Sequence, residues 1–161
     1  MSSAIDVAVI GVGLVGSAVL KQLATVPSLS ALKVVALQNS RKTLLAAPGQ
    51  HLALDHWQAQ LETSSSSALS LEQLVSELQV IQAKNRRHIA VVDNTSNDTV
   101  AGFYPSFLRA GFSVVTPNKK AFSGSVDLFS AMEEAKENDV RPLVYQESTC
   151  LLYTSDAADE G

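Results

Sequence analysis

Cysteine is nearly absent from this chain of 161 residues, because Cys150 is the only one. A single cysteine excludes an intrachain disulfide and fits a reducing compartment. The sequence also lacks an apolar run long enough to cross a bilayer, and no basic leader precedes an apolar stretch near Met1. We therefore expect a cytoplasmic protein that does not associate with a membrane.

Clusters of positive charge and of metal-ligating side chains are missing as well. The 12 Lys and Arg against 16 Asp and Glu give a net charge of -4, and no basic stripe indicates a nucleic-acid partner. His51, His56 and His88 show no metal-ligand spacing, and no Ser-His-Asp arrangement can be argued. With 46% hydrophobic residues, the chain is suited to one domain with a proper core.

What is present is an alternation of strands and helices. Strands are expected at residues 5–10, 33–37, 89–93, 112–116 and 142–146, and helices at 14–25, 54–61, 71 onward, 97 or 98 to 110, and 127–138. Ser70 and Gln73 predict a capping box for the third helix, and Pro105 predicts a kink or a late start in the fourth. The alternation predicts an α/β fold, a Rossmann-like, doubly wound and mostly parallel sheet of about six strands in the order 3-2-1-4-5-6.

A glycine turn, Gly11-Val12-Gly13-Leu14-Val15-Gly16, follows the first strand and opens the first helix. This is the context that the dinucleotide-binding pattern GxGxxG requires. Gly11 permits the tight turn, Gly13 lets the backbone approach a pyrophosphate, and Gly16 lets the helix pack close to the strand. All six residues are candidate cofactor contacts. A structural turn without a ligand is the alternative.

The second strand ends without the acid that usually binds the ribose 2′-hydroxyl of NAD. In its place stands Gln38-Asn39-Ser40-Arg41-Lys42, which has two cations and no carboxylate. Arg41 can fork onto a 2′-phosphate, which would favour NADP over NAD. A solvated loop charge is the alternative for Arg41 and the favoured interpretation of Lys42.

Two polar segments follow later strands. Asp93-Asn94-Thr95-Ser96 makes Asn94, Thr95 and Ser96 candidate contacts of the nicotinamide ribose and amide. A helix cap and turn is the alternative, and at least one of the four is expected to be a cap. Neighbouring Phe103 and Tyr104 are expected in the core or in a crevice wall rather than in chemistry.

The second segment, Thr116-Pro117-Asn118-Lys119-Lys120, puts cations at the strand end where ligands sit in an open parallel sheet. Because the two lysines are adjacent, we expect one to face the crevice and the other to be solvated. Lys119 is the candidate that polarises a carbonyl or holds a carboxylate. An ordinary surface pair is the alternative.

Together these segments resemble the N-terminal portion of homoserine dehydrogenase. The resemblance covers about residues 5 to 149 and is carried by 7–16, 92–96, 101–104, 116–122 and 146–149. The stretch from Asn39 to Trp57 is most similar to the form in bifunctional aspartate kinase–homoserine dehydrogenases. The family reduces aspartate semialdehyde to homoserine with NADPH or NADH, in the biosynthesis of amino acids such as threonine and methionine.

The resemblance also implies roles for single residues. Thr95 and Ser96 would lie near the nicotinamide, and Lys119 would be a catalytic residue between cofactor and substrate. Glu147 matches a family residue near a sodium site. The partner of the parent enzyme would be its small-molecule substrate, and we expect that parent to be a homo-oligomer.

Residues 150–161 do not continue the family pattern. They resemble the translation of sequencing-adapter DNA, so we expect 1–149 to be an NAD(P)-binding domain followed by an artefactual tail, with a genuine divergent terminus as the alternative. The substrate domain is then absent, and the fragment alone should have little or no turnover. Two other hypotheses stay open: a non-catalytic NAD(P)-sensing module, and the first domain of another amino-acid or semialdehyde dehydrogenase.

Overall fold

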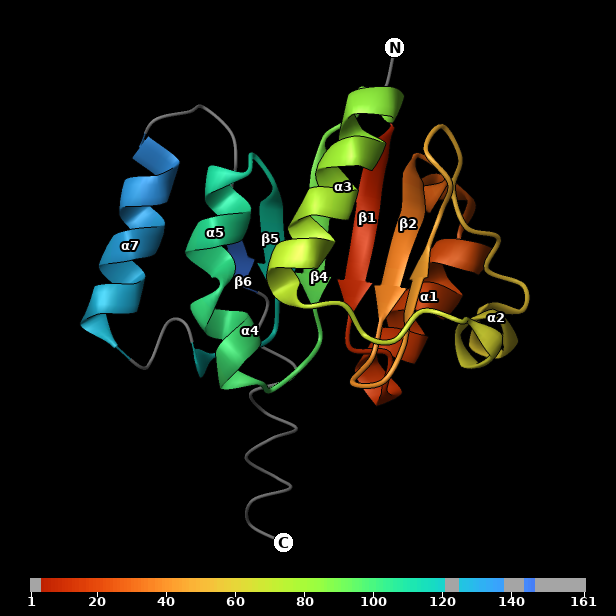
Figure 1. Cartoon of the computed structure of the whole chain (residues 1–161), viewed down its shortest axis with the longest axis horizontal. Coiled ribbons are helices and arrows are strands. Elements are labelled where there is room, and N and C mark those ends of the chain that lie inside the picture. The colour runs from red at the N-terminus through yellow and green to blue at the C-terminus, as the bar shows by residue number, and fades with distance from the viewer. Residues whose placement is uncertain (1–3, 121–124, 138–143, 147–161) are drawn as a thin grey trace, which may run out of the picture.

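The computed structural model describes residues 4–120, 125–137 and 144–146. Within these residues, six strands form one open sheet in the order β3-β2-β1-β4-β5-β6 (Figure 1). The strands are β1 (Ile5–Ile10), β2 (Leu32–Gln38), β3 (Thr43–Leu45), β4 (Ile89–Asp93), β5 (Ser113–Thr116) and β6 (Val144–Gln146). All neighbours pair in parallel except β2 and β3. The doubly wound order expected from the sequence is confirmed.

The short strand β3 is the part of the sheet that the sequence pattern did not locate. Asn39 explains it, because its side-chain oxygen accepts hydrogen bonds from the backbone N–H groups of Arg41 (2.8 Å) and Lys42 (2.7 Å). An asparagine that bonds the backbone two residues on closes a tight turn. The chain therefore returns along β2 as an antiparallel strand, with Ala36 opposite Leu45.

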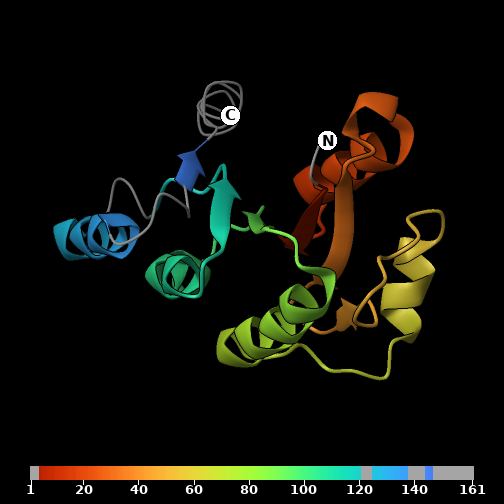
Figure 2. The same cartoon turned by 90° about the horizontal axis from the view of Figure 1, so that it is seen from above.

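Helices cover both faces of the sheet. They are α1 (Leu14–Thr25), the 3-10 turn η1 (Pro27–Leu29), α2 (Trp57–Thr63), α3 (Leu71–Asn85), α4 (Asp98–Gly102), α5 (Tyr104–Arg109) and α7 (Val126–Glu137). Figure 2 shows α1 on one face and α3 and α5 on the other, with α7 packed beside α5. In the part of the chain that the structure describes, no helix has the length and apolarity to cross a membrane.

Local sequence signals set several helix boundaries. Ser70 Oγ accepts from the Gln73 backbone N–H (3.1 Å) and Gln73 Oε1 accepts from the Ser70 N–H (3.0 Å), so the expected capping box opens α3. Pro105 lies in the first turn of α5, and Phe103 separates α4 from α5. The expected helix is thus divided where proline cannot continue the hydrogen-bond ladder.

The period-two alternation of β1 divides the core into two layers. Val7 and Val9 belong to a cluster with Leu20 of α1, whereas Ala8 and Ile10 belong to the larger cluster under α3 and α5. All four β1 side chains are buried, as expected for a central parallel strand.

The same strands bring three loops together at their carboxyl ends. Ile10 lies opposite Gln38 of β2 and Asp93 of β4. Beyond it, the Gly11 N–H donates to the Gln38 carbonyl (2.9 Å), and the Asn94 N–H donates to the Ile10 carbonyl (2.8 Å). The glycine turn therefore lies between the ends of β2 and β4, which is the switch point of a doubly wound sheet.

Candidate functional site

The glycine turn has the geometry that its three glycines predict. Gly11 has a φ of +88°, in the left-handed region that favours glycine. A Cβ on Gly16 would lie 2.1 Å from the Gly11 carbonyl oxygen, so only glycine lets α1 pack this close to the strand. A Cβ on Gly13 would meet no atom within 4 Å. Gly13 therefore borders open space, where a ligand can approach the backbone.

That open space lies at the N-terminus of α1. Gly13 is the N-cap residue, it makes no side-chain cap, and the first turn contains no acid. The first N–H groups of a helix lack intrahelical partners and carry a partial positive charge. Together with the open approach at Gly13, they have the chemistry to bind an anion such as a pyrophosphate.

A pocket of about 700 Å³ lies beside the turn. Its walls come from the ends of β1, β2 and β4, from the start of α3 and from α4. The lining residues are Ile10, Gly11, Gln38, Asn39, Ser40, Ala68, Leu69, Ser70, Leu71, Glu72, Thr95, Ser96, Asn97, Thr99, Val100 and Phe103. Gly11, Thr95 and Ser96 were expected there, and Phe103 was expected as a wall. The other candidate residues described by the structure lie outside this lining.

The segment 68–72 is the part of the pocket that the motifs did not indicate. A helix that precedes a parallel strand runs antiparallel to it, so the N-terminus of α3 must lie at the carboxyl edge of the sheet. The capping box at Ser70 was therefore a usable signal. Glu72, an exposed acid in the first turn of α3, also lines the pocket.

The end of β2 holds its wall of the pocket with buried polar contacts. Gln38 accepts from the Thr43 hydroxyl (2.6 Å) and donates to the Leu69 carbonyl (3.0 Å). Thr43 Oγ1 also accepts from the Leu69 N–H (3.0 Å). We name these three residues the Thr43 network. The network fixes the 68–72 segment against β2. It uses both the oxygen and the nitrogen of the Gln38 side chain in contacts within the protein.

The two cations after β2 differ in their surroundings. Lys42 Nζ donates to the Ser64 carbonyl (2.6 Å), so this lysine is tied to the loop after α2. Arg41 is exposed and follows Ser40, which lines the pocket. Lys42 is therefore half-buried and hydrogen-bonded rather than the solvated loop charge that the sequence favoured, and the role of Arg41 stays a prediction.

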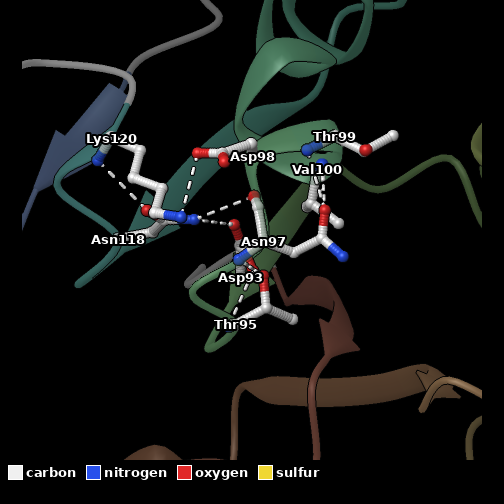
Figure 3. A network of polar contacts seen from close by, with 8 residues as sticks. All are labelled: Asp93, Thr95, Asn97, Asp98, Thr99, Val100, Asn118 and Lys120. Atoms are coloured by element: carbon white, nitrogen blue, oxygen red, sulfur yellow. Dashed lines mark hydrogen bonds and ion pairs between the residues drawn. The ribbon is translucent and has the colours of Figure 1, made fainter. Parts of the chain in front are cut away.

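Asp93 is fully buried at the end of β4 and joins several polar side chains (Figure 3). Its Oδ1 accepts from the Thr95 N–H (2.8 Å) and hydroxyl (2.6 Å). Its Oδ2 accepts from the Tyr104 hydroxyl (2.5 Å) and from Asn118 Nδ2 (3.4 Å). Asp93 therefore closes the turn, whereas the cap of α4 is Asn97, whose Oδ1 accepts from the N–H groups of Thr99 and Val100.

Tyr104 lies in the core, as expected, and it completes this arrangement. Its hydroxyl lies 2.9 Å from Oγ1 of Thr116, which donates to the Asp93 carbonyl (2.8 Å) and accepts the Asn118 N–H (2.8 Å). Burial raises the pKa of Tyr104 far above its usual range, and the Asp93 carboxylate raises it further, whereas the Thr116 contact lowers it. We name Asp93, Thr95, Tyr104, Thr116 and Asn118 the Asp93 network.

The two adjacent lysines after β5 differ in their contacts and burial. Lys120 forms an ion pair with Asp98 (3.0 Å) at the start of α4, and both side chains are largely exposed (Figure 3). Lys119 is half-buried and directly follows Asn118. That Lys119 faces a substrate stays a prediction.

One buried polar atom supports a ligand at this edge. Among the described residues, Asn94 Nδ2 is the buried side-chain atom without a hydrogen-bond partner. It would lie 3.5 Å from a Cβ on Gly16, so it borders the glycine turn. Buried donors in native proteins are nearly always paired, so this donor beside the glycine turn is one for which the described residues supply no acceptor. The residues present therefore fit a dinucleotide.

The proposed sodium site cannot be described in the same way. Glu147 lies outside the described residues, as do Cys150 and the rest of 147–161. Within the described ranges, no group of three or more His, Cys, Asp or Glu side chains could hold a metal ion.

Comparison with known proteins gives one consistent result. Residues 11–145 match the family model "Homoserine dehydrogenase, NAD binding domain". The homoserine dehydrogenase of Emericella nidulans is 40% identical, with 92% of this chain and 40% of that protein covered. The Saccharomyces cerevisiae enzyme is 36% identical over 90% of this chain and 39% of its own. A bifunctional aspartokinase/homoserine dehydrogenase of Haemophilus influenzae is 29% identical, with 88% of this chain and 17% of that protein covered.

Solved structures show the same fold. A protein of unknown function from Candida auris superposes with a TM-score of 0.78 at 35% identity, covering 91% of this chain and 39% of that one. A hyperthermophilic archaeal homoserine dehydrogenase in complex with NADPH has a TM-score of 0.63 at 21% identity. The match covers 90% of this chain and 44% of that one. This chain therefore spans about 40% of the length of the curated fungal relatives.

Proposed function

The chain belongs to the homoserine dehydrogenase family of NAD(P)-dependent oxidoreductases, in which it corresponds to the NAD-binding domain, and we propose that it binds a dinucleotide, NADP in preference to NAD. One observation carries the proposal. The uncapped N-terminus of α1 borders open space at Gly13 and lies beside the unpaired Nδ2 of Asn94. An anion-binding helix end next to a donor without an acceptor fits a bound phosphate-containing ligand.

Each part of the edge has a separate binding task. The N–H groups of 14–16 hold the pyrophosphate, and Asn94 Nδ2 donates to the ligand beside them. Thr95 and Ser96 contact the nicotinamide ribose and amide. Arg41 holds the 2′-phosphate, since the end of β2 offers no carboxylate that would repel it.

The whole parent enzyme would reduce aspartate semialdehyde to homoserine. The bound nicotinamide supplies a hydride. Lys119 polarises the substrate carbonyl or handles its proton, which is the chemistry that a cation at this edge can perform. The substrate domain, the homo-oligomer interface and the sodium site at Glu147 belong to the same proposal, in which residues 1–149 are the cofactor domain and the chain alone has little turnover.

A fluorescence titration with NADPH tests the binding proposal on the chain itself. We expect enhanced nucleotide fluorescence that saturates as NADPH is added. No binding at millimolar NADPH would contradict the proposal.

Arg41→Ala tests the preference for NADP, and the adjacent cation provides a matched control. Loss of a charge-assisted contact to the 2′-phosphate should weaken NADPH binding roughly threefold to tenfold and leave the affinity for NADH unchanged. Lys42→Ala removes the neighbouring charge, which is tied to Ser64, and should change neither affinity. Equal losses for NADPH and NADH in Arg41→Ala would remove Arg41 from the proposed site.

The coding DNA beyond codon 149 tests the proposed parent. A frame that continues into a substrate domain is expected. A stop codon in the genomic sequence directly after the present tail would favour a non-catalytic NAD(P)-sensing module.

A further inference from the structure

We propose that Asp93 and Tyr104 are positioning residues that hold the 94–97 loop and the Lys119 segment in register for the nicotinamide half of the cofactor. The inference rests on the proposed dinucleotide binding and adds to it. Neither side chain lines the pocket, and both are fully buried. They act through the residues that they hold.

The two carboxylate oxygens of Asp93 serve two different segments. Oδ1 holds Thr95, a pocket residue, through two hydrogen bonds of 2.8 and 2.6 Å. Oδ2 accepts from Tyr104 (2.5 Å) and Asn118 (3.4 Å), and Asn118 directly precedes Lys119. One planar carboxylate binds both segments. A shift of the Lys119 segment therefore turns the Asp93 carboxylate and changes the position of its Oδ1 relative to Thr95.

Tyr104 stabilises this arrangement from α5. Its hydroxyl reaches both Asp93 and Thr116, and Thr116 accepts the Asn118 N–H. Because burial and the carboxylate raise the pKa of Tyr104, the phenol stays protonated and remains a donor to Asp93. The ends of β4 and β5 are thus connected by a closed set of buried hydrogen bonds.

Two outer contacts connect the same segments in parallel. Asn118 Nδ2 lies 3.3 Å from the Asn97 carbonyl, which it reaches as a donor, and Lys120 pairs with Asp98 (Figure 3). The ion pair is exposed, so it adds little energy. The buried network therefore determines the relative placement of the two segments.

The adenosine side of the pocket is held independently. The Thr43 network fixes the wall formed by Gln38 and Leu69 and shares no residue with the Asp93 network. In a doubly wound sheet, the two nucleotide halves lie on opposite sides of the switch point, with the adenosine ribose at the end of β2. The Asp93 network, on the β4–β5 side, then acts on the nicotinamide half.

Two ligands and three variants of the whole chain test this assignment. NADPH carries both halves of the dinucleotide, whereas adenosine 2′,5′-bisphosphate carries only the adenosine half. Tyr104→Phe removes the buried hydroxyl of the Asp93 network, and Thr43→Val removes that of the Thr43 network. Ser113→Ala removes a buried hydroxyl that contacts His88 (2.7 Å) at the opposite edge of the sheet. Far-UV circular dichroism identifies the variants that are folded.

We expect Tyr104→Phe to raise the NADPH Kd about tenfold and to leave the bisphosphate Kd within about twofold. Thr43→Val should weaken the binding of both ligands. Ser113→Ala should leave the affinity for both unchanged. Equal losses of both ligands in Tyr104→Phe, or no loss of NADPH, would overturn the inference while leaving the proposed binding intact. If the unsubstituted chain binds neither ligand, the proposed function fails and the inference with it. If Tyr104→Phe does not fold, Asn118→Ala supplies the same test.

Discussion

Two fully buried aspartates lie at opposite ends of neighbouring central strands, and their partners differ. Asp6 is the second residue of β1 and contacts Asn85 (2.7 Å) and Arg87 (3.3 Å), which lie at and just after the end of α3. Asp93 ends β4, and its carboxylate accepts hydrogen bonds from neutral donors on three separate segments. The first aspartate anchors one helix to the sheet. The second organises the loops that surround a pocket.

The difference shows that burial alone does not identify a functional residue. Both carboxylates have hydrogen-bond partners, as buried charges must. Only the partners of Asp93 include a residue that lines the pocket and one that adjoins a candidate catalytic lysine. Those partners lie at the carboxyl edge of a parallel sheet, where ligands bind in doubly wound folds, and this position is the basis of the role proposed for Asp93.

Replacing each aspartate by alanine gives the largest expected effects. Asp93→Ala leaves several buried donors without an acceptor and should lower the free energy of unfolding by about 3–5 kcal/mol, with NADPH binding lost. Asp6→Ala should cost about 2–4 kcal/mol, because Arg87 can reach water, and should leave the NADPH affinity of the folded fraction unchanged. Urea denaturation and NADPH titration measure both. An equal loss of NADPH affinity in the two variants would remove the distinction between the two edges.

The glycine turn should separate stability from binding within the ligand edge itself. Gly16→Ala puts a Cβ against the Gly11 carbonyl and should cost about 1–3 kcal/mol of stability. Gly13→Ala meets open space and loses only the N-cap preference for glycine over alanine, so it should cost about 1 kcal/mol or less. Its methyl group should nevertheless raise the NADPH Kd about tenfold, because it occupies the approach to the helix N-terminus. A Gly13→Ala chain with normal NADPH affinity would place the ligand elsewhere.

The pH dependence of stability should show the smallest of these effects. Tyr104 has a raised pKa when folded, from burial first and the Asp93 charge second, so the unfolded state releases its proton near pH 10 while the folded state keeps it. Stability from this group is fully present below pH 10 and decreases above it, by about 1.4 kcal/mol per pH unit. Urea midpoints of the wild type and Tyr104→Phe at pH 8 to 11 isolate this contribution. Parallel curves would show that Tyr104 ionises as readily in the fold as in water.

Local signals were sufficient for much of the fold. The glycine turn, the capping box at Ser70 and the break at Pro105 all depend on contacts within a few residues, and the structure reproduces them. The strand order followed from alternating strands and helices. The strand Thr43–Leu45 was not predicted, because it is only three residues long and depends on the turn at Asn39.

The candidate site was predicted less completely. The sequence indicated the end of β1 by its glycine turn, and the ends of β2, β4 and β5 by the polar residues that follow those apolar strands. It could not indicate that Asp93 contacts Asn118, since 25 residues separate them and no local pattern connects them. The 68–72 wall was missed for a related reason, because α3 reaches the pocket only through the packing of the whole sheet.

Hydrogen exchange with and without NADPH tests the central claim most directly, because it reports both edges in one experiment. The account predicts slower amide exchange at residues 13–17 and 94–97 when NADPH is bound. Exchange at residues 85–90, around the partners of Asp6, should stay unchanged. Protection confined to 85–90, or no protection at the glycine turn at saturating NADPH, would contradict the assignment of the ligand to the carboxyl edge.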